Sequence, residues 1–423
     1  MAESLMHELE GYGIAGWLDP WLGLWALLFA SGVANLDFHR RFQRSIQGAP
    51  RLNPQKSIPD DLPSVSVIIP AYNEAVNIAG CMESVLSNKI PDGSQMTLIV
   101  ADDESTDDTR AIAQEIAATD SRVTVFTVPP RPTDKPWRGK NWACAQAVKR
   151  IDSEYLLFID ADVRLAEDAI AAALIDAQNH NVDLLSCGPK IVCNCFSEWL
   201  VQPLMALMIA VGFSFDAVND PSQKDTAMAA GPFMLFRTCA YEKIGGHAAV
   251  ATEAVEDVRL AETIKSYGLS LRLVLGIELV SVRMYRSFSG LWEGWTKNFY
   301  LAVERNPFLA VAAAIAVFLL FCVPWLGFAV GLVGLLLAAP AAGVTVGLSA
   351  VAIAAQMFMR IAAAQQTKDS LRYLYLTWLG GGIISAIAIV SMVKTETGWG
   401  WTWKGRSLAA PTIRDSSSSA LPD

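Results

Sequence analysis

Two short acidic clusters, far apart in the sequence, carry side chains that suit phosphate and proton chemistry. Asp160 and Asp162 directly follow the apolar run Tyr155–Ile159, and Glu256 with Asp257 forms the second cluster. Residues i and i+2 of an extended segment lie on one side, so Asp160 and Asp162 can face one divalent cation on a diphosphate. A carboxylate of the second pair can accept a proton from a hydroxyl group. Together the clusters indicate sugar transfer from a nucleotide donor.

Each of these motifs also has a purely structural interpretation. Both acidic pairs could stabilise the start of a helix through its dipole or as caps. The run 102–108 (DDESTDD) could likewise be a solvated turn that caps a helix. Lys140 is the opposite case, because a cation at the start of a helix opposes the dipole unless an anion lies nearby. A diphosphate would supply that anion, and a solvated lysine is the alternative.

Strand and helix patterns alternate in the segment that contains these motifs, residues 63–282. The predicted strands are 65–69, 97–101, 123–128 and 155–159, and the predicted helices are 73–88, 107–118, 140–150 and 167–177. This alternation is typical of an α/β fold with a doubly wound, mostly parallel sheet and helices on both faces. Ligands of such sheets bind beyond the carboxyl ends of the strands. Because the segments 70–74, 102–103 and 160–162 fall at three such ends, we expect one shared crevice.

An apolar segment near the N-terminus predicts a transmembrane anchor, residues 1–46. Residues 20–36 carry no charge, and Arg40, Arg41 and Arg44 follow them. A stretch of this length and composition can span a bilayer as a helix. Positive charges mark the cytoplasmic side of a span, so the catalytic domain that follows is expected in the cytoplasm.

A second group of apolar segments predicts C-terminal transmembrane helices within residues 307–395. Residues 307–359 are long enough for two crossings or three short ones, and two are expected. Residues 373–393 form a further candidate span. The number of crossings decides which side of the membrane receives the tail, residues 396–423.

Two further segments are predicted to bring the site close to lipid. A full crossing at 196–215 would place Asp160 and Asp257 on opposite sides of the bilayer, so this segment is expected either in the domain core or at the membrane interface. Residues 283–306 combine aromatic and charged residues, which is typical of an interfacial amphipathic segment. Both features favour a lipid or isoprenoid alcohol as the acceptor.

The composition argues against one class of partner. The chain has 423 residues, 52% of them hydrophobic, and a formal net charge of −9. A nucleic acid would require a basic face, so no nucleic acid partner is expected. The seven cysteines have no CxxC spacing, which is typical of reduced intracellular thiols.

The motifs, taken in order, resemble those of family 2 glycosyltransferases with the GT-A (Rossmann-like) fold. They are Pro70-Ala71-Tyr72-Asn73-Glu74, Asp102-Asp103-Glu104-Ser105, Asp160-Ala161-Asp162, Gly231-Pro232-Phe233 and Glu256-Asp257. Within this family the chain is similar to the membrane-bound branch that includes ceramide, hopanoid-associated and carotenoid glycosyltransferases. The resemblance covers roughly residues 63–300 and implies inverting transfer.

The resemblance also implies a role for each motif. The residues expected to bind the nucleotide-sugar donor are Pro70, Ala71, Tyr72, Glu74, Asp103, Lys140 and Asp160. Asp160 and Asp162 would hold Mg²⁺ or Mn²⁺ together with the diphosphate. Asp257 would be the base, and Glu256 would orient it or the acceptor. Relatives of this kind favour a UDP-hexose as the donor.

One family motif is missing, which changes the expected reaction. Many relatives carry Gln-x-x-Arg-Trp after the base, whereas Leu291–Trp295 retains only the tryptophan. Repeated chain extension is therefore not expected. Arg283 and Arg286 could replace the missing arginine at the leaving phosphates, or they could contact anionic lipid headgroups.

The function predicted from the sequence is transfer of one sugar to the hydroxyl of a carotenoid, hopanoid or sphingolipid-like acceptor. One alternative is transfer to a polyprenyl phosphate, whose acceptor oxygen is already anionic and needs no base. Another is a catalytically silent membrane scaffold or polysaccharide export partner. Dependence of the reaction on Asp257 separates the first two possibilities, and failure to bind a nucleotide sugar would favour the third.

Overall fold

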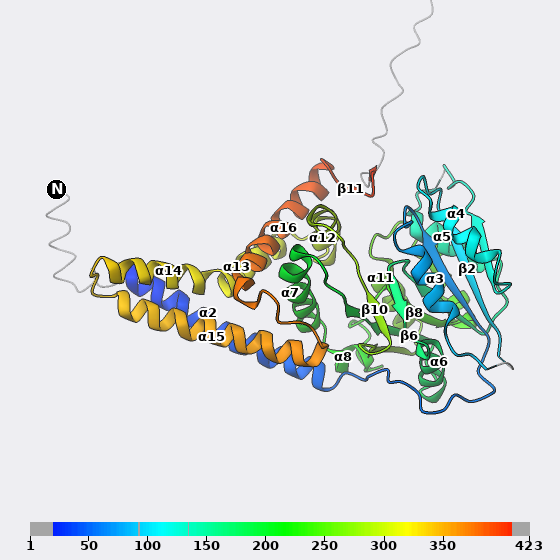
Figure 1. Cartoon of the computed structure of the whole chain (residues 1–423), viewed down its shortest axis with the longest axis horizontal. Coiled ribbons are helices and arrows are strands. Elements are labelled where there is room, and N and C mark those ends of the chain that lie inside the picture. Colours follow the sequence, from blue (N-terminus) through cyan, green and yellow to red (C-terminus); the bar gives the residue numbers. More distant parts are fainter. Residues whose placement is uncertain (1–19, 92–93, 134, 408–423) are drawn as a thin grey trace, which may run out of the picture.

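The computed structural model describes residues 20–91, 94–133 and 135–407 (Figure 1). Its central sheet lies at one end of the molecule, and the long apolar helices α2, α14 and α15 extend away from it at the other end. The segment between them contains α7, α12 and α16. The sequence motifs lie at the sheet end, so the domain that carries them and the apolar arm are separate parts of one chain.

The central sheet has seven strands in the order β3-β2-β1-β4-β8-β6-β9. Their bounds are β1 Val65–Ala71, β2 Met96–Asp102, β3 Val123–Thr127, β4 Tyr155–Ile159, β6 Leu184–Gly188, β8 Phe233–Arg237 and β9 Leu271–Leu275. Strands β3, β2, β1 and β4 are parallel, β6 and β9 are parallel, and β8 is antiparallel to both neighbours. β4 is buried along its whole length, which explains its continuous apolar run. The predicted mostly parallel α/β sheet is confirmed.

Helices cover both faces of this sheet, and the side chains of each strand alternate between two cores. The helices around the sheet are α3 Ile78–Leu86, α4 Thr109–Ala117, α5 Gly139–Val148, α6 Ala169–Asn179, α8 Phe215–Asn219, α9 Thr238–Lys243, α10 Gly246–Ala249 and α11 Glu256–Ser266. Ile68 packs in the core that contains α5, and Ile69 packs in the core that contains α3 and α6. The predicted helix 73–88 begins later, at Ile78, because the preceding residues form a loop with a positive φ at Asn73.

A small three-stranded sheet lies between the end of β4 and the helices α7 (Phe196–Gly212) and α12 (Phe288–Ala302) along the chain. It consists of β5 Val163–Leu165, β10 Val280–Val282 and β7 Lys190–Ile191. Beyond it, the buried carboxylate of Glu198 accepts hydrogen bonds from the backbone N–H groups of Asn194 and Cys195, at 2.6 and 2.7 Å. Arg283 pairs with the same carboxylate at 3.1 Å. Arg283 therefore neutralises a buried carboxylate, and Arg286 donates a hydrogen bond to Asn77 (2.7 Å).

The helix at the predicted interface segment 196–215 is α7, Phe196–Gly212, and its first half is buried. α7 packs against α16, α2 and α12 (Phe288–Ala302), and Trp295 of α12 donates a hydrogen bond to Gln202 at 2.7 Å. Phe196 and Ile209 remain substantially exposed. α7 is thus core on one side and apolar surface on the other.

Apolar helices form the arm of the molecule. They are α2 Pro20–Gln47, α13 Pro307–Phe321, α14 Val323–Leu336, α15 Ala342–Thr367 and α16 Thr377–Thr397, with the short turn η2 Leu374–Leu376 before α16. Among the described residues, three helices are long and apolar enough to cross a membrane, and α13 with α14 makes a fourth candidate bent by 46°. The bent pair and α15 occupy the stretch for which two crossings are expected.

The bend between α13 and α14 has an identifiable cause and identifiable partners. Pro324 has no N–H group for the carbonyl of Leu320 four residues earlier. That carbonyl instead accepts hydrogen bonds from the side-chain amides of Asn35 and Gln356, both at 3.1 Å, and Gln356 also donates to the carbonyl of Phe321 at 3.2 Å. Freed backbone groups within an apolar layer require such partners.

Replacing Gln356 with leucine should destabilise the protein by about 1 kcal/mol, because it removes donors from two buried carbonyl groups. The expected result is a lower thermal unfolding midpoint of the purified chain in detergent micelles. Gln365→Leu is the matched control, because Gln365 is exposed on the same helix. Equal midpoints for both variants would contradict this role of Gln356.

Candidate active site

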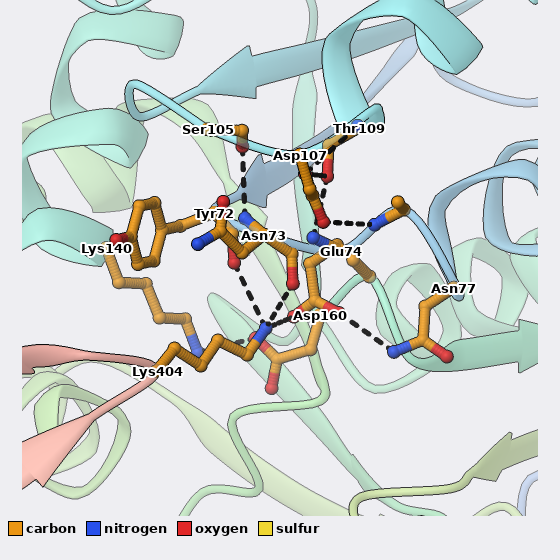
Figure 2. A network of polar contacts seen from close by, with 12 residues as sticks. Tyr72, Asn73, Glu74, Asn77, Ser105, Asp107, Thr109, Lys140, Asp160 and Lys404 are labelled. Atoms are coloured by element: carbon orange, nitrogen blue, oxygen red, sulfur yellow. Dashed lines mark hydrogen bonds and ion pairs between the residues drawn. The ribbon is translucent and has the colours of Figure 1, made fainter.

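The carboxyl ends of β1 and β2 are joined by hydrogen bonds between the loops that follow them (Figure 2). The N–H of Asn73 donates to the hydroxyl of Ser105 at 3.0 Å, and the N–H of Glu74 donates to that of Thr109 at 2.7 Å. In return, the side-chain oxygen of Asn73 accepts from the N–H of Thr106 at 2.9 Å. The run 102–108 is therefore more than a solvated turn, since it fixes the loop that carries Tyr72 and Glu74.

The predicted donor-binding residues at these ends contribute in different ways. Pro70 and Ala71 are the last residues of β1, and the carbonyl of Ala71 accepts a hydrogen bond from the N–H of Asp103 at 2.8 Å. This bond places Asp103 beside the β1 loop. The ring of Tyr72 and the carboxylates of Glu74 and Asp103 lie on neighbouring loops as a result.

Lys140 joins the two acidic clusters. It lies in the first turn of α5, and its ammonium group pairs with Asp160 and with Glu256, each at 2.7 Å. Two carboxylates of the protein, rather than a diphosphate alone, thus supply the anion expected beside this helix start. Burial opposes the charge of Lys140, but Asp160 and Glu256 outweigh it and raise its pKa well above the ordinary value. Burial likewise opposes ionisation of Glu256, whose pKa is nevertheless lowered because Lys140 is adjacent.

Asp257 is held by backbone groups in the first turn of α11. Its carboxylate accepts hydrogen bonds from the N–H groups of Gly231 and Val258, both at 2.9 Å. A Cβ atom at position 231 would lie 2.9 Å from a carboxylate oxygen of Asp257, so the close approach requires glycine. Burial, and then the charge of Glu256, raise the pKa of Asp257 to about 6.

Asp162 combines an unpartnered oxygen, counted among the described residues, with a raised pKa. Its Oδ1 atom is buried and has no hydrogen-bond partner among the described residues. Burial, followed by the charges of Asp160 and Glu74, raises the pKa of Asp162 to about 8. A divalent cation would offset both the burial of the Asp162 charge and its repulsion by the neighbouring carboxylates, because hard cations bind carboxylate oxygens and favour their ionised form. The unpartnered oxygen of Asp162 is consistent with such a cation, and its binding by Asp160 and Asp162 stays a prediction.

The sequence analysis missed two cations of the site, Lys404 and Arg406. They belong to the hairpin of β11 (Thr402–Trp403) and β12 (Arg406–Ser407), which follows α16. Lys404 pairs with Glu74 at 2.5 Å, and Arg406 pairs with Asp103 at 2.5 Å. The basic, tryptophan-rich run 401–406 and its Lys-Gly turn were the available signal, but no local pattern shows where such a hairpin docks.

Replacing Lys140 with methionine should lower the free energy of unfolding of the metal-free protein by about 2 kcal/mol at pH 7, since two carboxylates lose their partner in a half-buried site. The lowered pKa of Glu256 means that its pairing stabilises the fold above the ordinary pKa of glutamate and is lost as the pH falls through the folded-state pKa. The difference from wild type should therefore persist from pH 7 down to about 4.5, the ordinary pKa of glutamate, and shrink as the pH falls further.

Denaturant unfolding in EDTA, measured across this pH range, tests the prediction. Lys149→Met is the matched control, because Lys149 is exposed at the other end of α5. A loss of stability that does not depend on pH would exclude the carboxylate pairing as its cause.

Comparisons with known proteins agree with this geometry. Residues 66–245 match the family model "Glycosyl transferase family 2". The 4,4'-diaponeurosporenoate glycosyltransferases of Staphylococcus aureus strains USA300 and NCTC 8325 are each 31% identical over 239 residues, which is 56% of this chain and 60% of theirs. The chain thus aligns with less than two thirds of the length of each of these relatives.

A solved structure shares the fold. It is a mannosyltransferase from Pyrobaculum calidifontis in complex with GDP-Man and Mn²⁺, with a TM-score of 0.52 and 20% sequence identity over 88% of this chain and 99% of that one. The architecture, the motifs and these matches agree: the chain has the GT-A fold, its residues 66–245 resemble a family 2 glycosyltransferase domain, and it is similar to the diaponeurosporenoate glycosyltransferases.

Proposed function

We propose that the chain transfers a single sugar, with inversion, from a nucleotide diphosphate sugar to the hydroxyl of an apolar, lipid-like acceptor at a membrane. The observation that carries this proposal is the shared ion pairing of Lys140 with Asp160 and Glu256. It joins Asp160, one residue of the expected cation-binding pair, to Glu256, the neighbour of the expected base, just beyond the carboxyl end of β4. A carotenoid, hopanoid or sphingoid alcohol is the proposed acceptor class.

The donor is proposed to bind where the loops after β1, β2 and β4 meet. Tyr72, Glu74 and Asp103 would contact the nucleotide, and Asp160 with Asp162 would hold Mg²⁺ or Mn²⁺ beside the diphosphate. When bound, such a cation offsets negative charge on the departing diphosphate. The related fold that binds GDP-Man and Mn²⁺ supports this class of ligand. A UDP-hexose is the proposed donor.

The proposed chemical step is a direct displacement assisted by Asp257. Its carboxylate takes the proton of the acceptor hydroxyl while the hydroxyl oxygen forms a bond to the anomeric carbon. The bond between that carbon and the diphosphate oxygen breaks on the opposite face, which inverts the configuration. The N–H groups of Gly231 and Val258 hold the carboxylate in place, and its raised pKa makes it a stronger base than an exposed aspartate.

An apolar acceptor is supported by the surroundings of the site. α7, α12 and α16 pack together between the sheet and the apolar arm, and Phe196 and Phe288 are about half exposed there. Trp295 and Phe299, which the sequence favoured at a membrane surface, are instead buried. The acceptor would approach from the cytoplasmic membrane surface, next to the exposed apolar residues of α7 and α12.

A second acceptor class is supported by the names of the relatives. The "diaponeurosporenoate" in the names of the S. aureus proteins denotes a carboxylate. A carboxylate oxygen is already anionic at neutral pH and needs no base. The same holds for the phosphate oxygen of a polyprenyl phosphate. The alcohol remains the primary proposal, because a hydroxyl can donate a hydrogen bond to Asp257 and a carboxylate cannot.

The direct test is activity of the chain reconstituted in liposomes with Mn²⁺ and a UDP- or GDP-hexose. Matched isoprenoid substrates that end in an alcohol, a carboxylate or a phosphate are offered separately, and mass spectrometry detects the added hexose. Hexose on the alcohol supports the proposal, and hexose only on the carboxylate or phosphate supports the second acceptor class. Absence of product with every donor and acceptor would contradict glycosyl transfer to these lipids.

Replacing Asp257 with asparagine should lower kcat about 10²–10⁴-fold with the alcohol acceptor, because the amide cannot take the proton. Donor binding should be retained, since Asp257 is assigned to the acceptor. In the wild type, kcat/KM should fall as the pH drops below about 6, where the carboxylate becomes protonated. Glu262→Gln, a change of a partly exposed carboxylate on the same helix, is the control. An unchanged kcat for Asp257→Asn would remove the base from the mechanism.

Replacing Asp162 with asparagine should raise the Mn²⁺ concentration needed for half-maximal activity by more than about tenfold, because a cation loses a charged ligand. The measurement is a Mn²⁺ titration of activity at saturating donor. Asp152→Asn serves as a control, because Asp152 lies before β4 and outside the site. A titration curve that matches the wild type would show that Asp162 is not a metal ligand.

A further inference from the structure

The hairpin after α16 contacts the loops that follow β1 and β2, which carry Tyr72, Glu74 and Asp103. These loops are called the nucleotide loops below, after their proposed ligand. Its turn is formed by Lys404 and Gly405, which both have positive φ angles, of 47° and 80°. Two consecutive residues of this kind form the tight turn that suits a two-residue hairpin. Figure 2 shows the Lys404 side chain extended toward the loop of Tyr72, Asn73 and Glu74.

Lys404 uses all three of its donor positions on that loop. Its ammonium group donates to the carbonyls of Tyr72 and Asn73, both at 3.1 Å, and to Glu74 at 2.5 Å. Two of these three partners are neutral carbonyls. A diphosphate could replace them with charged oxygens, which form stronger hydrogen bonds with an ammonium group.

Arg406 holds the hairpin in this position. Its guanidinium lies over the ring of Tyr72, with Cζ 3.4 Å from the ring centroid, and donates to the carbonyl of Asp103 at 2.7 Å. On the other side of the hairpin, Thr402 donates to Glu293 at 2.8 Å. Lys297 lies over the ring of Trp403, 4.2 Å from its centroid. The hairpin thus connects α12 to the nucleotide loops.

Three basic residues that could serve the leaving phosphates already have other partners in this structure. The family arginine of Gln-x-x-Arg-Trp is missing from Leu291–Trp295. Arg283 neutralises buried Glu198, and Arg286 donates to Asn77, so neither takes over that position in this structure. Lys140 is shared by two carboxylates. Lys404, on the hairpin, has one carboxylate partner, Glu74, and two neutral carbonyl partners on the loop after β1.

We propose that Lys404 binds the diphosphate of the donor and that Arg406 is a positioning residue that holds the hairpin against the nucleotide loops. This inference rests on the proposed glycosyl transfer. It extends the donor site to a segment beyond the last membrane helix, so donor binding depends on the fold of that segment. The lysine supplies positive charge at the leaving group in place of the missing arginine.

The test is isothermal titration of the full chain in detergent micelles with UDP and with GDP, each with Mn²⁺, and with UMP and GMP. Lys404→Met should weaken binding of the diphosphate nucleotide about 10- to 100-fold, the loss expected for one charged hydrogen-bonding partner. It should weaken binding of the monophosphate less. Lys404→Arg, which keeps the charge, should restore most of the affinity, and Lys394→Met is the control outside the site.

Each other outcome overturns the inference. Unchanged affinity in Lys404→Met would show that the lysine does not contact the diphosphate. Equal losses for the diphosphate and monophosphate nucleotides would assign Lys404 a role in loop structure only, and tighter binding would make the hairpin a competitor of the donor. A wild-type chain that binds neither UDP nor GDP would instead contradict the proposed function itself, and this inference with it.

Discussion

Concentration of carboxylates at one partly buried site is the constraint on which the rest of the site depends. Asp103, Asp160 and Glu256 come from different elements, and charges brought together away from water require partners. Lys140 meets this requirement for two of them by pairing with Asp160 and Glu256 at 2.7 Å. Asp162 is left with a raised pKa and, among the described residues, an oxygen without a hydrogen-bond partner, which is consistent with the proposed divalent cation.

The fold supplies this arrangement through strand ends and close backbone approaches. Parallel strands direct their carboxyl ends to one edge, where the loops after β1 and β2 hold each other by hydrogen bonds. Gly231 allows a backbone N–H to reach Asp257. In the apolar arm, Asn35 and Gln356 donate hydrogen bonds to the carbonyl of Leu320 that Pro324 leaves without its helical partner, so this carbonyl is paired at the bend.

Much of this structure follows from local sequence patterns, whereas its long-range pairings do not. The buried strand Tyr155–Ile159 was predicted with its observed bounds, because a short apolar run between polar residues identifies a parallel strand. The helix predicted from residue 73 begins at Ile78, because hydrogen bonds to the 102–109 segment hold the loop open. The pairing of Lys140 with Glu256 and the docking of Lys404 join distant residues, and periodicity contains no information on such contacts.

A double-mutant cycle between Lys140 and Glu256 tests the central claim most directly, namely that one cation unites both acidic motifs. The free energies of unfolding of Lys140→Met, Glu256→Gln and the double variant are compared with the wild type at pH 7 without metal. The account predicts a coupling energy of about 1–3 kcal/mol, as expected for a contacting charged pair. Effects that add to within about 0.5 kcal/mol would contradict it, because independent sites behave in that way.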